Sequence, residues 1–305
     1  MDVVLDQFQR RGIELKTNRN LLPDDTTTLF VCSGMQNHKD RFRRRSGERI
    51  ASLQSCLRTD DIALVGDGSH LTYFEMLGYF SFGNDDYSDA VDLWHGIVKT
   101  LRIPVTSVHI HPKRRDHRLI WETLGYDTVF DPNCIWSDGS VCGECCELYC
   151  GDLEIGNLVN PLGHSVDVGF GWERIIQVIE NVPRIDQTSL FRQGVHPIVA
   201  DHERAVAALL ENGIRPGPRG RPYVCRRLLR RLLRFDGVSM PAHPEGRVRT
   251  PDGLALSDYL ETERRLRQKQ LSLGRRLWKR FRDKPQEWWW ETAGLFPEEI
   301  PMIQL

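Results

Sequence analysis

Residues suited to nucleotide chemistry gather around position 170. Gly169-x-Gly171-x-x-Arg174 follows a short apolar run that contains Asp167. Glycines let a backbone approach a bound group closely, and an arginine fork can donate two hydrogen bonds to phosphate oxygens. Taken alone, the same spacing also fits a glycine turn before a helix whose arginine faces solvent. The pattern therefore needs support from the rest of the chain.

Cysteines form a second cluster with chemical potential. Cys142, Cys145, Cys146 and Cys150 lie within nine positions. The N-terminus lacks the basic start and apolar run of a signal peptide, so we expect reduced thiols or a metal site rather than disulfides. Together with His164, the cluster could supply the four ligands of a tetrahedral zinc site.

A third group of residues is basic. Between positions 215 and 235 there are eight arginines and no acidic residue, among them Arg226, Arg227, Arg230 and Arg231. The whole chain has 41 Lys+Arg against 42 Asp+Glu, so a polyanion must be met by a local patch of this kind. Such a face could contact RNA phosphates, or it could be the solvated side of a helix.

These residues need elements to position them. Apolar periodicity predicts helices over 3–12, 89–101 and 118–124, and strands over 29–32, over 108–110 and, interrupted at Gly78, over 73–82. The segment 167–180 reads as a strand, a glycine turn and a helix. This order is not a regular βαβ repeat, so we expect an α+β fold for the first part.

The second part is expected to be helical. Apolar faces predict helices over 197–211, 225–234 and 256–284, with a Pro/Gly-rich stretch at 237–253 between the last two. A chain of 305 residues suits two domains, which we place at 1–185 and 186–305. No run approaches the roughly 20 apolar residues of a membrane span, so we expect a soluble, cytoplasmic protein.

Three blocks, in order, resemble the signatures of alanyl-tRNA synthetases, which are class II aminoacyl-tRNA synthetases. The first spans 25–42 and contains Gly34-Met35, the second runs from Cys56-Leu-Arg58 through 70–83, and the third is 165–174. Weaker similarity extends over nearly the whole chain. The resemblance implies an antiparallel sheet flanked by helices, followed by a smaller helical domain. It also implies ATP-dependent formation of an aminoacyl-adenylate.

The resemblance further implies roles at the nucleotide. Arg58 would bridge the amino-acid carboxylate and the α-phosphate, and Arg174 would lie across the adenine and reach the γ-phosphate; these two are the expected catalytic residues. The residues expected to bind ATP are Arg58, His70, Phe74, Gly169, Gly171 and Arg174. Ordinary core packing for Phe74 and a polar surface position for His70 remain open.

Other residues would bind the amino acid and the metal. Asp167 would pair with the α-ammonium group, while Met35, Trp136 and Val159 would keep the pocket small, although each of the three also fits ordinary core. Glu147 would hold Mg²⁺ on the phosphates. The expected substrate is alanine or another small amino acid, because a small pocket rejects serine or glycine only modestly. The family has a metal-free turn at the cysteine cluster, so zinc is not expected.

The chain departs from the family pattern in several places. Full-length members continue into an editing domain and a C-terminal domain, the segment between Arg58 and His70 is shortened, and Gly220 stands near where the family has an asparagine that reads the tRNA acceptor stem. These departures favour transfer of the aminoacyl group to a non-tRNA acceptor, such as a metabolite amine or a carrier-protein thiol. A minimal alanine–tRNA ligase is the alternative. An inactive RNA-binding or regulatory paralogue is a third reading, against which the retained Arg58, Asp167 and Arg174 argue.

Overall fold

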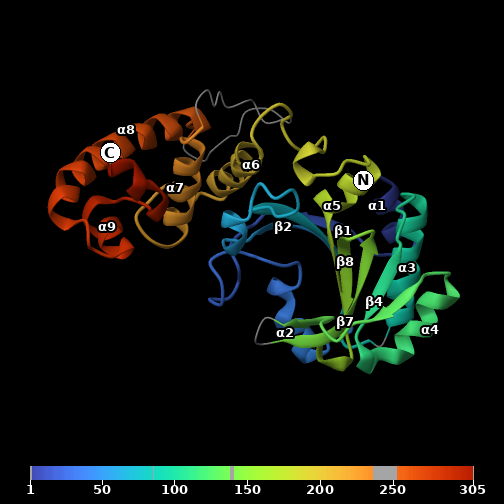
Figure 1. Cartoon of the computed structure of the whole chain (residues 1–305). Coiled ribbons are helices and arrows are strands. Elements are labelled where there is room, and N and C mark those ends of the chain that lie inside the picture. Colours follow the sequence, from blue (N-terminus) through green and yellow to red (C-terminus); the bar gives the residue numbers. More distant parts are fainter. Residues whose placement is uncertain (1, 85, 138–140, 236–252, 305) are drawn as a thin grey trace. The chain divides into compact units, whose positions relative to one another are not determined.

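The structure is a computed structural model that describes residues 2–84, 86–137, 141–235 and 253–304. The chain divides into two compact units, Met1–Gly194 and Val195–Leu305 (Figure 1). We call them the sheet unit and the helical unit. The first ends a few residues beyond the boundary expected at 185.

A mixed sheet of nine strands organises the described part of the sheet unit. Its order is β1 (Leu15–Asn18), β2 (Arg49–Leu57), β3 (Tyr73–Ser81), β9 (Val166–Gly171), β8 (Leu153–Val159), β7 (Cys142–Cys150), β4 (Ser107–Ile110) and β5 (Thr128–Phe130), with β6 (Ile135–Ser137) paired to β7. The strands from β2 to β4 pair antiparallel, whereas β1 and β5 pair parallel at the two ends. The expected α+β class is confirmed, and parallel pairs are added at both edges.

Helices cover one face of this sheet. They are α1 (Asp2–Gln9), α3 (Tyr87–Thr100) and α4 (Arg115–Thr123) (Figure 1). Their apolar residues share one core with the strands, and Trp94 stacks on Phe170 with ring centroids 3.9 Å apart. Since side chains alternate along a strand, burial of Val168 and Phe170 against the helices turns Asp167, Gly169 and Gly171 to the opposite face.

The remaining short elements of the sheet unit lie in its connections. They are α2 (Lys39–Arg44), α5 (Trp172–Ile179) and the 3₁₀ turns η1 (Gln36–His38), η2 (Asp60–Ala63), η3 (Pro112–Arg114), η4 (Pro161–Gly163) and η5 (Ile185–Gln187). The α5 helix follows β9 directly, so the strand and the helix predicted within 167–180 are present, whereas the glycine turn expected between them is not.

Two strand predictions were wrong in detail. Residues 19–35 contain neither helix nor strand, although 29–32 reads as an apolar strand. Leu29 is 43% exposed, so this run has no face to bury as a strand would. The second error is the interruption expected at Gly78. That glycine pairs with Ser52 and Gly169 inside a continuous β3.

The helical unit contains α6 (Pro197–Glu211), α7 (Gly220–Leu232), α8 (Leu256–Phe281), α9 (Gln286–Ala293) and the 3₁₀ turn η6 (Pro297–Ile303). The α7 helix packs between α6 and α8, and η6 returns against α8. The Pro/Gly-rich stretch expected at 237–253 lies almost wholly outside the described residues. No helix in the described ranges is both long and apolar enough to cross a membrane.

A glycine under the Trp94–Phe170 stack tests this packing. A Cβ at Gly156 would lie 2.4 Å from Cγ of Phe170 and 2.7 Å from the carbonyl oxygen of Gly169. We expect Gly156→Ala to lower the free energy of unfolding by about 2 kcal/mol, measured by urea denaturation. Gly96→Ala is the control, because only the flexible end of Gln7 approaches its Cβ, and an α3 alanine should be neutral or stabilise by up to about 1 kcal/mol. Equal stability of Gly156→Ala and the unchanged chain would contradict the packing.

Candidate active site

A pocket of about 360 Å³ lies on the sheet face opposite α1, α3 and α4. Ten residues singled out from the sequence line it: Met35, Arg58, His70, Phe74, Trp136, Glu147, Asp167, Gly169, Gly171 and Arg174. They come from segments far apart in the chain, which the sheet brings together.

Strand register explains why these residues meet. Gly169 pairs with Asn157, and Asn157 pairs with Glu147, so the three side-chain positions share one face across β9, β8 and β7. On β3, Met76 pairs with Gly171 and continues the same face. Glycine fits this row closely, because a Cβ at Gly169 would lie 3.0 Å from the sulfur of Met76.

Val159 is the exception among the predicted residues. It pairs with Asp167 in the register but is fully buried, packing with Cys134, Cys145 and Trp136. Val159 therefore does not line the pocket as predicted, and it belongs to the buried cluster against which Trp136 packs. Met35 does line the pocket, and it also belongs to an aromatic cluster with Phe80.

Arg58 stands at the end of β2 with its side chain exposed. Its Nε donates to the carbonyl oxygen of Cys32 at 3.1 Å, and its guanidinium carbon lies 4.9 Å from the ring centroid of Phe74. Among the described residues no partner holds its two terminal nitrogens, which leaves that edge of the fork for a ligand. A guanidinium that lies over an aromatic face can still donate hydrogen bonds from its own edge.

Arg174, in the first turn of α5, is held from β8. Its Nη1 donates to the backbone oxygen of Glu154 at 2.7 Å and to the Glu154 carboxylate at 3.1 Å. The neighbouring Glu173 is buried, and its carboxylate accepts the backbone N–H of Glu75 at 3.0 Å. Glu154, Asn157 and Glu173 all line the pocket. Glu154 and Asn157 were not predicted as site residues because no strand was expected over 153–159, and Glu173 was not predicted although its helix was expected.

His70 is oriented by a turn of its own loop. Its Nδ1 lies 2.5 Å from the carboxylate of Asp67, which also accepts the backbone N–H groups of Ser69 and His70 at 2.9 Å. Burial opposes ionisation of Asp67, but these hydrogen bonds outweigh it and hold the pKa well below its usual range. A proton on Nδ1 leaves Nε2 of His70 as the ring atom that can meet a ligand.

Carboxylates of two kinds face the pocket. Burial raises the pKa of Asp167 to about 7. Burial also raises the pKa of Glu147; a hydrogen bond from Tyr149 at 2.9 Å opposes the shift, while the nearby charge of Glu154 adds to it. A bound cation would lower both raised pKa values by stabilising the ionised carboxylates. The cation would be an ammonium group at Asp167 and a metal ion at Glu147, beside Glu154.

The cysteine cluster does not converge on one point. Cys145 shares the pocket side of β7 with Glu147, whereas Cys146 points into the helix-covered core and contacts the hydroxyl of Tyr87 at 3.0 Å. Cys142 is exposed. Within the described ranges, no group of three or more His, Cys, Asp or Glu side chains is arranged to hold a metal ion.

The four arginines predicted as RNA contacts pair with other residues of the helical unit. Arg230 is 2% exposed and binds Glu263 at 3.4 Å and Glu299 at 3.0 Å. The other three are half-buried: Arg226 binds Glu263, Arg227 binds Glu298, and Arg231 donates to His202. Residues distant in sequence supply their acceptors, and burial leaves Arg230 no surface for RNA. For the three half-buried arginines, RNA contact stays a prediction.

Comparisons with known proteins show the family of the chain. The chain matches the family model described as tRNA synthetases class II (A), over residues 2–161 and 154–243. The alanine–tRNA ligase of Desulfitobacterium hafniense (strain Y51) is 32% identical over 79% of this chain and 35% of the relative, and that of Desulforamulus reducens is 31% identical over 76% and 34%. The chain thus spans about a third of the length of these curated relatives. Among solved structures, a pyrrolysyl-tRNA synthetase from D. hafniense matches with a TM-score of 0.41 and 13% identity, over 62% of this chain and 71% of that one.

The raised pKa of Asp167 predicts a pH-dependent stability effect. Below about pH 4 this group is protonated in both states, and above pH 7 the folded chain holds a buried charge that the unfolded chain solvates. Asp167→Asn should therefore raise Tm at pH 8 by about 3 °C or more, and the gain should vanish as the pH falls from 7 to 4. Asp152→Asn, on an exposed turn, is the control for calorimetry at each pH. A gain at pH 8 that persists at pH 4 would mean that the carboxylate is not the cause.

The buried arginine predicts a large local effect. Arg230→Met would leave Glu263 and Glu299 without their central partner, so we expect a loss of about 3 kcal/mol from the helical unit in thermal unfolding. Arg264→Ala is the control, because Arg264 follows Glu263 on α8. Its side chain is 52% exposed and pairs with Glu261, so its loss should cost less than about 0.5 kcal/mol. Similar costs for both variants would contradict the buried network.

Proposed function

The chain belongs to the class II (A) tRNA synthetases, and from this membership we propose that it activates alanine with ATP and transfers the alanyl group to tRNA. One observation carries the proposal. The two arginines, the buried aspartate and the glycine row line the same pocket. The names of the curated relatives support alanine as the amino acid and tRNA as the acceptor.

In the first step, a carboxylate oxygen of alanine attacks the α-phosphorus of ATP. The bond to the bridging oxygen breaks, pyrophosphate leaves with the electron pair, and alanyl-adenylate remains. Arg58 offers two donors in one plane, so it can hold the attacking carboxylate and the α-phosphate together and meet the charge that builds up between them. Arg174, fixed by Glu154, holds the far phosphate, while Phe74 supplies a ring face for the adenine.

The amino acid would bind beside the buried carboxylate of Asp167. Asp167 becomes fully ionised when an ammonium group pairs with it, because the pair replaces the water that burial removed. Met35 and Trp136 limit the space beside it. A side chain larger than that of alanine would have to displace these residues, whereas serine and glycine differ too little to be rejected strongly.

Magnesium is the metal that the family implies, and the carboxylates present fit it. Glu147 and Glu154 lie on adjacent strands, both line the pocket, and the charge of one raises the pKa of the other. Magnesium is commonly held by one or two carboxylates together with substrate phosphates. When bound, it would neutralise charge on the phosphates of ATP.

In the second step, a ribose hydroxyl at the 3′ end of tRNA attacks the carbonyl carbon of the adenylate, and AMP leaves. A non-tRNA acceptor is the second candidate, and two observations favour it. Gly220 begins α7 without a side chain near where the family reads the acceptor stem. In addition, Arg227 and Arg230 are engaged inside the helical unit.

The deciding measurement follows labelled alanine into total tRNA while AMP release is measured in the same reaction. We expect ATP-dependent charging that falls at least about 10²-fold in Arg58→Ala, because a donor to the transition-state charge is lost. Arg41→Ala, an exposed arginine paired with Glu48, is the control and should keep full activity.

Other results would reassign the protein. Alanine-dependent AMP release without charging would reject tRNA as the acceptor and support the second candidate. Neither signal would overturn both and favour the inactive paralogue.

A further inference from the structure

The loop that brings Ser33, Gly34 and Met35 to the pocket has no regular structure. It lies within residues 19–35, so neither a helix nor a strand satisfies its backbone groups. Backbone hydrogen bonds join it to itself and to β2, from Val31 to the carbonyl of Leu21 at 2.9 Å and from Leu57 to the carbonyl of Val31 at 2.8 Å. At its end, Gln36 and His38 donate to the carbonyls of Ser33 and Met35 in the first turn of η1. Side chains must provide the rest of the order.

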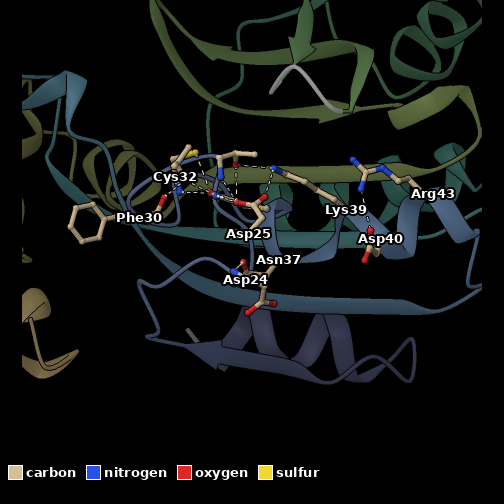
Figure 2. A network of polar contacts seen from close by, with 11 residues as sticks. Asp24, Asp25, Phe30, Cys32, Asn37, Lys39, Asp40 and Arg43 are labelled. Carbon is tan, nitrogen blue, oxygen red and sulfur yellow. Dashed lines mark hydrogen bonds and ion pairs between the residues drawn. The ribbon is translucent and has the colours of Figure 1, made fainter. Parts of the chain in front are cut away.

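Asp25, within this segment, and Lys39, on α2, form the centre of a polar network (Figure 2). Lys39, at the start of α2, is 7% exposed and donates to the carboxylate of Asp25 at 2.8 Å. The same carboxylate accepts the backbone N–H and the hydroxyl of Thr27 at 3.1 and 2.7 Å. Burial opposes ionisation, but these hydrogen bonds hold the pKa of Asp25 at about 2, so the ion pair is complete at neutral pH.

Gln36 connects this ion pair to the active site. It is 4% exposed, and its amide nitrogen donates to Thr28 at 2.7 Å and to Asp25 at 3.4 Å. Its amide oxygen accepts the backbone N–H of Cys32 at 2.9 Å. The carbonyl of Cys32 in turn accepts Nε of Arg58 at 3.1 Å. Contacts therefore run without a break from Lys39 through Asp25, Gln36 and Cys32 to Arg58.

We propose that Asp25, Gln36 and Lys39 are positioning residues for Arg58, and that they act through the backbone N–H and carbonyl of Cys32. Arg58 is exposed and long, and the Cys32 carbonyl is its hydrogen-bond anchor among the described residues. A side chain with several rotatable bonds needs such an anchor to present its fork in one geometry. Displacement of a catalytic group by about 1 Å can cost about 10²-fold in rate. Movement of the Cys32 carbonyl would therefore displace Arg58 and lower the rate of adenylate formation. The catalytic part of the inference rests on the proposed function.

The chain provides a matched control for the network. Asp40 and Arg43 form an ion pair of 3.1 Å on α2 next to Lys39, but their side chains are 72% and 48% exposed (Figure 2). Among the described residues, no chain of polar contacts leads from this pair to Cys32. Asp40→Asn removes a charge from the same helix as the network. It should leave Arg58 unaffected.

The first test is kinetic and uses ATP–pyrophosphate exchange with alanine. Gln36→Met keeps the size and burial of the side chain but removes the acceptor for Cys32, and we expect its kcat to fall about 10- to 100-fold with a smaller change in KM for ATP. Asp25→Asn and Lys39→Met should show the same split, Lys39→Arg should retain most activity, and Asp40→Asn should match the unchanged chain. In an Arg58→Ala background, Gln36→Met should cost no more than about 2-fold, because the group it positions is already missing.

The second test does not require activity. Hydrogen exchange of the Arg58 Nε proton, followed by NMR, should be at least about 10-fold faster in Gln36→Met and in Asp25→Asn, and unchanged in Asp40→Asn. Unchanged exchange in both folded network variants would overturn the inference, as would an equal kcat loss from Gln36→Met with and without Arg58. If the unchanged chain shows no pyrophosphate exchange with alanine, the proposed function fails, and the NMR result alone decides whether the network positions Arg58.

Discussion

One face of the sheet packs against helices and the other lines the pocket. The antiparallel register of β3, β9, β8 and β7 keeps these two sets of side chains apart. Each residue that turns toward α3 is followed by one that turns toward the pocket. On β9, Val168 and Phe170 pack against the helices, whereas Asp167 and Gly169 face the pocket. A shift of one residue in β9 would turn Asp167 into the helix-covered core and Phe170 toward the pocket. The apolar core thus specifies the position of every polar group on the other side.

This separation has a cost in stability that the site requires. A carboxylate as desolvated as that of Asp167 weakens the folded state whenever it is ionised, and Glu147 and Glu154 repel one another. The helix-covered face offsets these costs with the large aromatic stack and with aliphatic packing. An irregular loop completes the pocket, and it relies on buried side-chain hydrogen bonds where a strand would use its neighbours.

Much of this site could be predicted from the sequence, because the blocks around Met35, Arg58 and Arg174 carry their own signals. Their convergence on one pocket could not be read locally, since it depends on pairing between strands up to about a hundred residues apart. Glu154 was missed because its strand alternates too weakly to be recognised. The apolar run 29–32 was misread because isolated backbone bonds at Val31 and the Gln36 side chain at Cys32 take the place of a strand ladder.

The arginines of α7 show the same limitation from the other side. A helix with leucines on one face and arginines on the other is typical of a solvated surface, and nothing near Arg230 in the sequence indicates that it is buried. The acceptors Glu263 and Glu299 stand 33 and 69 positions later. Propensity and periodicity cannot anticipate such partners.

The late position of Glu299 has a consequence for how the helical unit is made. During synthesis Arg230 leaves the ribosome 69 residues before its last partner, so α7 must wait in water with its charge solvated. Only when η6 arrives can Arg230 be dehydrated together with Glu299 and with the carbonyl of Gly294 that it also binds. The hydrogen bonding of Arg230 is thereby completed only by Gly294 and Glu299, near the end of the described chain.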